Sequence, residues 1–208
     1  MIRHGQSMAN ADGLFAGQFD SPPTELGLMQ ARMAAEYVSA NYIIDKVYTS
    51  DLKRAYAVGR AVADKISTEP IKDEDLREIN AGLWEGKHFD ELLEKFDTYR
   101  NTWLHDIGNV TCDGGESVAH LQERFVSALK RIGDENDGKT VVIATHATPI
   151  RALCCHCAGK GLSEMKDIPW VTNASTSVFE YENGKFTEAS IGYDEYLGDV
   201  VTKFPSNV

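Results

Sequence analysis

The sequence begins Met1-Ile2-Arg3-His4-Gly5-Gln6-Ser7, and Asn10 follows shortly after. A neutral imidazole is a good nucleophile toward phosphorus, and the guanidinium fork of an arginine fits the oxygens of a phosphoryl group. Gly5 allows the backbone to turn sharply behind these two side chains. Because Arg-His-Gly is a short motif, it indicates phosphoryl chemistry only if the chain also supplies a second histidine, a second arginine and a proton donor.

The most continuous β-branched run in the chain is Val141-Val142-Ile143-Ala144, which predicts a central strand buried on both faces. His146 follows at the carboxyl end of that strand, and a helix is expected to start at Thr148-Pro149, because proline is tolerated in a first turn. The strand predicted at 46–50 leads to Arg54 in the first turn of the next helix. A cation there opposes the helix dipole, so Arg54 is a candidate for a functional role.

Helical spacing of apolar residues predicts further helices. One begins at the N-cap Thr24 and ends near Asn41, one is capped by Ser50 or Asp51, and a long one is capped by Ser117.

Segments outside these helices predict further strands. Residues 69–78 are expected to form a strand and its approach, and the segments 176–181 and 186–191 are joined through Asn183-Gly184, a strong hairpin signal. Strands that alternate with helices predict an α/β fold. We expect a three-layer sandwich with a mostly parallel central sheet flanked by helices, one antiparallel edge strand and a small helical cap insertion.

The length of 208 residues suits one sizeable core and is short of two ordinary domains. We therefore expect a single domain over residues 1–208. Residues 89–106 predict one or two short amphipathic helices outside the main alternation, so the cap insertion is placed at roughly 81–115. Its aromatic residues either line the substrate mouth or belong to the core, and the sequence favours neither: Trp84, Phe89 and Trp103.

In a sheet of this kind, ligands bind outside the carboxyl ends of the strands. Phosphoryl transfer needs an in-line nucleophile, positive charge on the phosphoryl oxygens and a proton for the leaving oxygen. We assign the attack to His4 and the proton transfer to Glu78, with His146 holding the phosphoryl oxygens. The expected phosphate ligands are Arg3, Asn10, Arg54, the amide of Ala147 at a helix N-terminus, and Gln18.

Arg3–Ser7 with Asn10 resembles the signature of the histidine phosphatase superfamily, the phosphoglycerate-mutase-like fold. Residues 49–55 resemble the second-arginine motif, and residues 76–86 resemble the acid motif. Gly115–Ser117 and His146–Arg151 complete the set in the family's order, so the resemblance covers nearly the whole chain. It implies the roles given above, an α/β sandwich, and neither a metal nor a cofactor.

The residues after Glu78 bear on the branch of the family. Ile79-Asn80-Ala81-Gly82 follows it, which resembles the phosphatase branch. We therefore expect a metal-independent phosphomonoester hydrolase that acts on small phosphorylated metabolites through a phosphohistidine. The alternatives are a cofactor-dependent phosphoglycerate mutase-type phosphotransferase and a weakly catalytic phosphate-ligand binding module on the same fold.

Three features depart from the family pattern. Little chain precedes Arg3, so the first strand is expected to be short and the His4 loop less rigid. Ala147 follows the second histidine, where relatives usually carry glycine. Ala16 replaces a polar phosphate ligand, which is why Gln18 is proposed to serve instead.

The formal net charge is −11, from 21 Lys and Arg against 32 Asp and Glu, which argues against nucleic acid or an anionic membrane as the main partner. No apolar run reaches the roughly 20 residues that span a bilayer, and the sequence has no apolar signal region, so we expect a cytoplasmic protein. The expected partner is a small-molecule phosphomonoester, and a homodimer is compatible with the fold.

Three of the four cysteines lie in Cys154-Cys155-His156-Cys157. This spacing lacks the paired Cys-x-x-Cys of structural zinc sites, so we interpret them as small, semi-buried helix residues in a reducing compartment.

Overall fold

The computed structural model describes residues 1–202. The predicted domain ran to residue 208, and residues 203–208 lie outside the described part of the chain.

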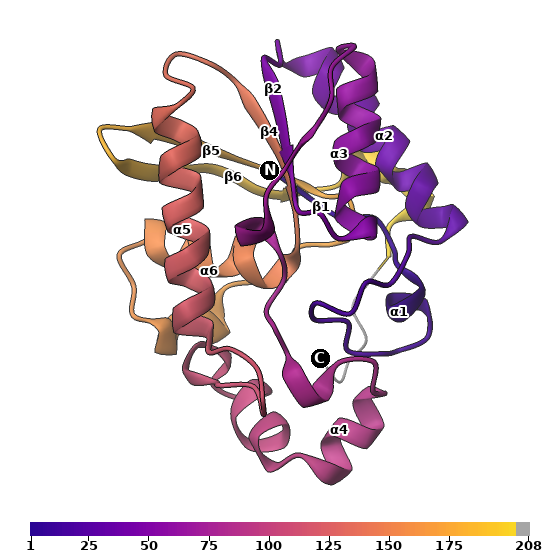
Figure 1. Ribbon diagram of the computed structural model, residues 1–208, viewed down its shortest axis with the longest axis vertical. Coiled ribbons are helices and arrows are strands. Elements are labelled where there is room, and N and C mark those ends of the chain that lie inside the picture. Colours follow the sequence, from indigo (N-terminus) through magenta and orange to yellow (C-terminus); the bar gives the residue numbers. More distant parts are fainter. Residues whose placement is uncertain (203–208) are drawn as a thin grey trace.

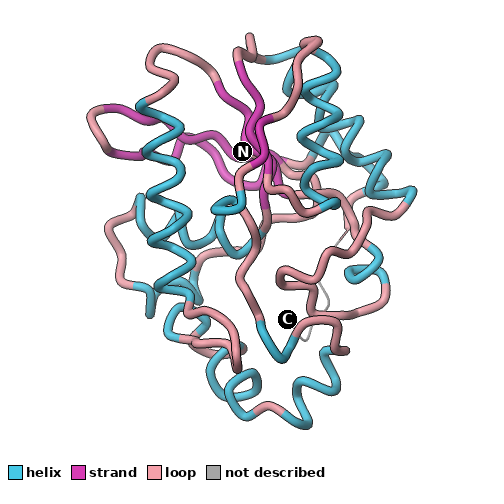
Figure 2. The backbone as a smooth tube through the Cα atoms, in the orientation of Figure 1, coloured by secondary structure: helices cyan, strands magenta, loops and turns pink. Residues whose placement is uncertain are grey.

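Within residues 1–202 the central sheet has six strands, in the spatial order β3-β2-β4-β1-β5-β6. Figures 1 and 2 show the strands in the interior of the molecule, with helices on both sides. The first four strands in that order are mutually parallel, whereas β5 is antiparallel to both β1 and β6. The sheet is therefore mixed and mostly parallel, which confirms the predicted α/β fold. The strands are β1 (Ile2–Arg3), β2 (Lys46–Thr49), β3 (Ile71–Lys72), β4 (Val141–Thr145), β5 (Thr176–Glu182) and β6 (Lys185–Tyr193).

The predicted hairpin is β5 and β6, joined at Asn183 and Gly184. Both of these residues have positive φ, 51° and 78°, as a two-residue type I′ turn requires. Because the turn reverses the chain, β5 is the antiparallel strand and lies one position in from the edge, while the edge strand β6 runs in the direction of β1.

Helices cover both faces of the sheet, which gives the three predicted layers (Figure 1). Side chains alternate between the faces, as the strand pleat requires: Val47 and Val142 pack with α2 and α3, whereas Tyr48 and Ile143 pack with α5 and α6. The helices are α1 (Met8–Ala11), α2 (Glu25–Asn41), α3 (Lys53–Lys65), α4 (Phe89–Lys95), α5 (Val118–Asp134) and α6 (Ala147–Cys157).

Two of the predicted helix caps are confirmed. The Thr24 hydroxyl accepts a hydrogen bond from the amide of Gly27, and the Ser117 hydroxyl accepts one from the amide of His120. The third prediction is wrong, because the N-cap of α3 is Leu52 and no side chain caps it. Ser50, one of the two predicted caps, contacts a histidine of the candidate site instead.

The predicted strand at 69–78 is shorter than expected. Only Ile71 and Lys72 pair with β2, and a 3-10 helix follows at Glu74–Leu76. The Asp73 carboxylate accepts a hydrogen bond from the Asp75 amide and so caps this helical turn. The chain therefore leaves the sheet before it reaches Glu78.

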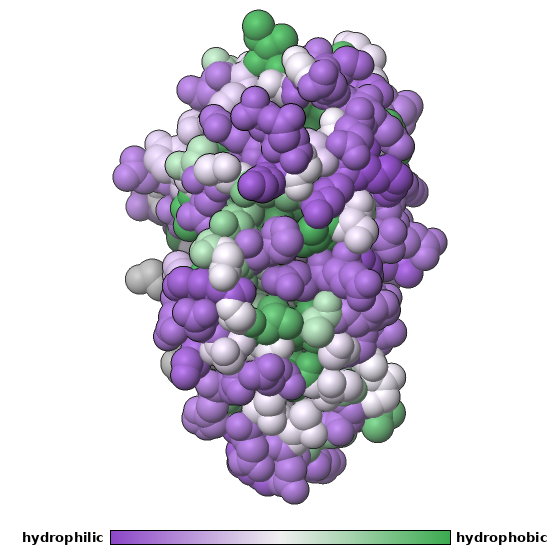
Figure 3. All heavy atoms as spheres, turned by 90° about the vertical axis from the view of Figure 1, so that its left-hand side faces the viewer, coloured by the Kyte–Doolittle hydropathy of each residue, from purple (hydrophilic) through white to green (hydrophobic). Residues whose placement is uncertain are grey.

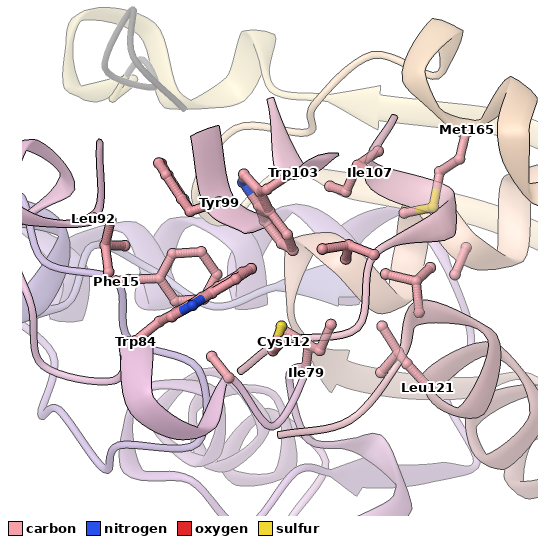
Figure 4. Packing of buried hydrophobic residues seen from close by; sticks show 14 of the residues in the cluster. Phe15, Ile79, Trp84, Leu92, Tyr99, Trp103, Ile107, Cys112, Leu121 and Met165 are labelled. Carbon is pink, nitrogen blue, oxygen red and sulfur yellow. The ribbon is translucent and has the colours of Figure 1, made fainter. Parts of the chain in front are cut away.

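The segment 81–115 lies at the carboxyl end of the sheet and contains α4, a π-helix (Tyr99–Trp103) and a 3-10 helix (Ile107–Asn109). Its core is an aromatic cluster around Phe15, in which the rings of Trp84, Tyr99 and Trp103 pack edge-on against the Phe15 ring (Figure 4). The centroids are 5.0 to 6.2 Å from that of Phe15, within the range that favours edge-to-face pairs. Trp84 is fully buried and is thus a core residue.

The short first strand is held firmly by its surroundings. A Cβ at Gly5 would lie 2.3 Å from the Gly27 carbonyl oxygen, and a Cβ at Gly27 would lie 2.0 Å from the Gln6 carbonyl oxygen. The first turn of α2 therefore packs backbone to backbone against the loop that carries His4. Further along, the His4 carbonyl accepts hydrogen bonds from the amide of Ala174 and the side chain of Asn173.

A cavity of about 880 Å³ lies on the amino side of β1, where β4 and β5 diverge. Its walls include Val141–Ile143 of β4, Val178 of β5 and Leu129 of α5. It is remote from the carboxyl ends of the strands.

One face of the surface is mostly polar. The face turned toward the viewer in Figure 3 is largely hydrophilic, with a broken hydrophobic patch near its middle. Over the described residues, no helix combines the length and the apolar composition needed to cross a bilayer.

The close contact at Gly27 generates a testable prediction. Gly27→Ala should lower the free energy of unfolding by roughly 1–3 kcal/mol, because the added methyl group forces the helix away from the His4 loop. Urea unfolding measures this loss. Gly161→Ala is the matched control, because the nearest atom to its Cβ is the Ser163 hydroxyl at 3.7 Å. A Gly27→Ala protein as stable as the control would show that the backbone contact is not tight.

Candidate active site

Three neighbouring strand ends meet at one point of the sheet. His4 follows β1, Ser50 follows β2 and His146 follows β4. The His4 amide donates to the Thr145 carbonyl over 2.9 Å, and the Ser50 amide donates to the Ala144 carbonyl over 2.9 Å. The Ser50 hydroxyl in turn lies 2.9 Å from Nε2 of His146. Parallel pairing thus brings both predicted histidines together.

The two histidine rings are buried, with centroids 5.1 Å apart. Nδ1 of His4 lies 2.7 Å from the carbonyl oxygen of Gly5. A carbonyl only accepts hydrogen bonds, so Nδ1 of His4 carries the proton and Nε2 holds the free lone pair. This tautomer leaves Nε2 of His4 available as a nucleophile.

Both histidines are neutral at physiological pH. Burial lowers the pKa of His4 and of His146 well below the usual value of a histidine, and the nearby positive charge of Arg54 lowers both further. A neutral ring is the form that can attack phosphorus.

Two buried arginines supply positive charge beside these rings. Arg3 donates from Nη1 to the Val171 carbonyl over 2.6 Å, and Arg54 donates to the carbonyls of Phe19 and Gly17 over 3.0 and 2.6 Å. Burial lowers the pKa of Arg3 to about 9 and that of Arg54 to about 10. Both side chains therefore still carry their charge at neutral pH.

Two buried nitrogen atoms of the site have no hydrogen-bond partner among the described residues: Nε of Arg54 and Nδ1 of His146. Buried polar atoms without partners are rare and costly. A bound anion would satisfy a donor at either position.

Glu78 reaches the same place from the loop that follows the 3-10 helix at 74–76. It is half-buried, one carboxylate oxygen accepts from the amide of Ile79 over 2.8 Å, and the other accepts from the amide of Thr148 over 3.3 Å. Thr148 lies in the first turn of α6, which begins at Ala147, one residue earlier than predicted. The carboxyl group is therefore held against the helix N-terminus.

A cavity of about 70 Å³ joins these groups. Its polar lining consists of Arg3, His4, Asn10, Arg54, Glu78 and Thr148, with Ala147 beside them. His146 is not part of this lining and meets it through its ring contact with His4. The structure thus brings together all but one of the predicted site residues.

The exception is Gln18. Its side-chain amide donates to the carbonyl of Glu78 over 3.1 Å, and the residue does not line the cavity. Because its amide holds the Glu78 loop in this structure, the expectation that Gln18 replaces a phosphate ligand at position 16 stays a prediction. Ala16 itself does line the cavity.

Sequence reasoning missed a second residue that holds the same loop. Arg124 of α5 donates to the carbonyls of Asp75, Arg77 and Glu78 over 2.8 to 3.0 Å, and it is paired with Glu116. Glu116 belongs to the Gly115–Ser117 motif, which is the only signal the sequence offered. We call these hydrogen bonds from Arg124 to the Glu78 loop the clasp. It depends on backbone carbonyl groups, whose positions cannot be inferred from the sequence.

Two further arginines near the site make structural contacts. Arg77 pairs with Asp51 outside the cavity. Arg151 donates to the carbonyls of Ile168 and Met165, and it stacks over the Trp170 ring with 3.9 Å between the guanidinium carbon and the ring centroid. Arg151 thus has structural contacts one turn into α6.

Cys154 and Cys155 are buried in α6, and burial raises the pKa of both thiols. Across residues 1–202, no three His, Cys, Asp or Glu side chains are grouped so that they could hold a metal ion.

Comparison with known proteins gives a consistent family assignment. Residues 1–194 match the family described as the histidine phosphatase superfamily (branch 1). The chain is 30% identical to phosphoserine phosphatase 1 of Hydrogenobacter thermophilus over 199 residues, which cover 96% of this chain and 93% of that protein. It is 31% identical to phosphoglycerate mutase-like protein 4 of Arabidopsis thaliana over 186 residues, which cover 88% and 79%.

Solved structures with the same fold include YhfR of Bacillus stearothermophilus, with a TM-score of 0.88 and 28% identity over 94% of this chain and 96% of that one. A variant of phosphoserine phosphatase from Entamoeba histolytica in complex with phosphoserine has a TM-score of 0.79 and 25% identity, over 94% and 96%.

The buried histidines make stability depend on pH. Their pKa values are lowered on folding, so below about pH 6.5 the unfolded chain binds protons that the native protein does not. The free energy of unfolding should therefore fall as pH drops from 6.5, by up to about 1.4 kcal/mol per pH unit for each histidine. Urea unfolding in phosphate-free buffers at pH 7.5 and pH 5.0 measures this loss.

The matched variants for this experiment are His146→Gln and His105→Gln. His105 is exposed, so its removal should leave the pH dependence unchanged, whereas His146→Gln should reduce it. An equal pH dependence in both variants would contradict the neutral, buried state of His146.

The clasp on the Glu78 loop predicts that Arg124→Met lowers kcat by roughly ten- to a hundredfold, because a shift of about 1 Å in a reacting group has an effect of that size. KM should change little, since Arg124 does not line the cavity, and the alkaline limb of the pH–rate profile should move. Arg131→Met is the control, since Arg131 pairs with Asp73 at the surface. A change in KM alone would contradict a positioning role.

Proposed function

The chain belongs to the histidine phosphatase superfamily, branch 1, and on that premise we propose that it is a metal-independent phosphomonoester hydrolase that acts on small phosphorylated metabolites through a phosphohistidine. One observation carries the proposal. The neutral His4 ring, with its Nε2 lone pair free, shares a cavity with two arginines and one carboxyl group.

In the first step, Nε2 of His4 attacks phosphorus and forms an N–P bond as the ester P–O bond breaks. Glu78 gives its proton to the departing alkoxide oxygen, so the alcohol leaves neutral. The hydrogen bond from Nδ1 of His4 to the Gly5 carbonyl keeps the ring oriented and stabilises the positive charge that the ring gains. A phosphate dianion close to Glu78 favours the protonated carboxyl group that this step requires.

In the second step, the Glu78 carboxylate takes a proton from a water molecule, whose oxygen attacks phosphorus. The N–P bond breaks, His4 recovers its lone pair, and inorganic phosphate leaves. Glu78 ends protonated, as it began. Both steps thus use the same two residues: Glu78 acts first as an acid and then as a base, and His4 acts first as the nucleophile and then as the leaving group.

Positive charge for the phosphoryl oxygens comes from the protein itself. Arg3 and Arg54 are cations at neutral pH, and the N-terminus of α6 adds the amide of Ala147. His146 and Asn10 are the further ligands in this proposal. A site with two buried guanidinium groups can neutralise a phosphoryl dianion as a bound metal ion would.

The relatives support a hydrolase of phosphorylated metabolites. The relative from Hydrogenobacter thermophilus is named a phosphoserine phosphatase, and the Entamoeba histolytica protein was solved with phosphoserine and with 3-phosphoglyceric acid. These names describe those proteins. For this chain they support the reaction class more than the substrate.

The test is inorganic phosphate release from a panel of sugar phosphates, phosphoglycerates, nucleotides and an aryl phosphate, with a chelator present. Release should persist in chelator and fall by more than about a thousandfold in His4→Ala, which removes the nucleophile. Glu78→Gln should lower kcat by about 10²–10⁴-fold, the usual contribution of a general acid. His88→Ala is the control, because His88 is exposed.

A quench at alkaline pH should also trap a phosphoryl group on the native chain and none on His4→Ala, as seen by mass spectrometry. Release that His4→Ala retains would overturn the proposed mechanism. Interconversion of phosphoglycerates with little phosphate release would support a mutase instead, and binding without turnover would support a binding module.

A further inference from the structure

The wall of the cavity that faces away from the phosphate ligands is apolar and aromatic. It is built by three stretches far apart in the sequence, namely the loop at 14–16, the segment 81–115 and the chain after α6. Their lining residues are Leu14, Phe15, Ala16, Phe89, Trp103 and Trp170. A leaving group attached to phosphorus in this cavity would lie against these side chains.

The aromatic wall is packed into a single unit. The Phe89 amide donates to the Gly13 carbonyl, and the Phe15 amide donates to the Lys87 carbonyl, so the loop and the segment 81–115 are joined by backbone hydrogen bonds. The rings of Phe15 and Trp103 lie 5.0 Å apart, and those of Trp103 and Trp170 lie 6.3 Å apart. The wall therefore holds its shape without a ligand.

Charge is unevenly distributed over the cavity. Among its described lining residues, the only side chains that are cations at neutral pH are Arg3 and Arg54, at the phosphate end. Glu78 is the only acidic residue among the described residues that line it. Near the mouth, Lys87 pairs with Glu91 over 3.5 Å and does not line the cavity. A carboxylate on the leaving group would thus meet aromatic rings and no further cation.

That arrangement has an energetic consequence. In phosphoserine and in 3-phosphoglycerate, two carbons separate the ester oxygen from the carboxyl carbon, so the carboxylate stays close to the lining of the cavity. Removing an ionised carboxylate from water without a partner is strongly unfavourable. An uncharged ring loses no such hydration, and its faces can stack on the tryptophans.

We propose that this site selects phosphomonoesters of uncharged, ring-bearing alcohols over esters whose alcohol carries a carboxylate, and that Trp170 is a main determinant of this preference. The inference rests on the proposed function and gives it a substrate class. It separates this chain from the relatives named for phosphoserine.

Trp170 is the decisive residue because a cation lies against its ring. The Arg151 guanidinium stacks on that ring, its Nη1 has no hydrogen-bond partner among the described residues, and Arg151 itself does not line the cavity. Removing the indole would open a path from the leaving-group side to this buried cation. Trp170 thus sets both the apolar character of the wall and the access to Arg151.

The experiment compares kcat/KM within pairs of substrates that differ in one carboxylate. Benzyl phosphate is paired with 4-carboxybenzyl phosphate, and glycerol 3-phosphate with 3-phosphoglycerate, so that the reactivity of the leaving oxygen is similar within each pair. The native chain should prefer the uncharged member by at least about tenfold, which corresponds to about 1.4 kcal/mol. Benzyl phosphate should be the best of the four substrates.

Trp170→Ala should reduce both ratios by raising kcat/KM for the carboxylate-bearing members. The double variant Trp170→Ala with Arg151→Met should lose that gain, because the exposed cation is gone. Leu83→Ala is the control, since Leu83 is an exposed apolar residue of the segment 81–115 and does not line the cavity. It should leave both ratios as in the native chain.

The outcomes separate the two proposals. No phosphate release from any ester would overturn the proposed function. Release with equal or faster turnover of the carboxylate-bearing esters would overturn the substrate preference and leave the phosphatase standing. The ratios of the native chain already decide this, even if a Trp170 variant fails to fold.

Discussion

The hydrogen bond from the His4 amide to the Thr145 carbonyl, at 2.9 Å, is the constraint on which the site depends. It sets the register of β1 against β4. His4 and His146, which follow these two strands, therefore lie side by side and their rings are in contact. The adjacent strand β2 ends at the same edge of the sheet, so Ser50, which follows it, contacts His146. Because the parallel strands end at one edge, three short segments far apart in the chain supply one surface. Gly5 and Gly27 then let α2 pack directly behind it.

The electrostatics follow from how the two arginines are held. Each guanidinium donates to backbone carbonyls, of Val171 for Arg3 and of Gly17 and Phe19 for Arg54. Carbonyl groups orient a guanidinium without cancelling its charge, whereas a carboxylate partner would neutralise it. Both buried charges attract Glu78, and they add to burial, the larger effect, in keeping both histidines neutral. One arrangement thus produces the anion site and the free imidazole lone pair.

Much of the fold and of the candidate site could be predicted from the sequence. A residue placed directly after a strand has its position fixed by the sheet. His4 and His146 were placed in this way, and Arg54 was placed by its position in the first turn of the helix that follows β2. The helix caps Thr24 and Ser117 were visible as local signals. Gln18, Ser50 and Arg124 were not foreseen in their observed roles. Each contacts a group at least 46 positions away in the chain, and for Gln18 and Arg124 that group is a backbone carbonyl, which has no sequence signature. The third strand was overextended because Leu76, which ends a 3-10 helix, and Ile79 just after the predicted segment are buried outside the sheet.

Because β1 has only two residues, the sheet is expected to open locally beside it. Within residues 1–202 the β5–β6 hairpin joins the rest of the sheet along a short contact, in which Ile2 pairs with Thr176 and Met1 exchanges hydrogen bonds with Ser177. Beyond this contact β4 and β5 diverge around a cavity. Such a joint opens locally at a lower free energy than the paired centre of the sheet, and its amides exchange hydrogen with solvent sooner. The chain just before this joint carries Asn173 and Ala174, which hold the His4 carbonyl. Local opening of the hairpin is therefore coupled to the residues that hold the backbone of His4, the candidate nucleophile.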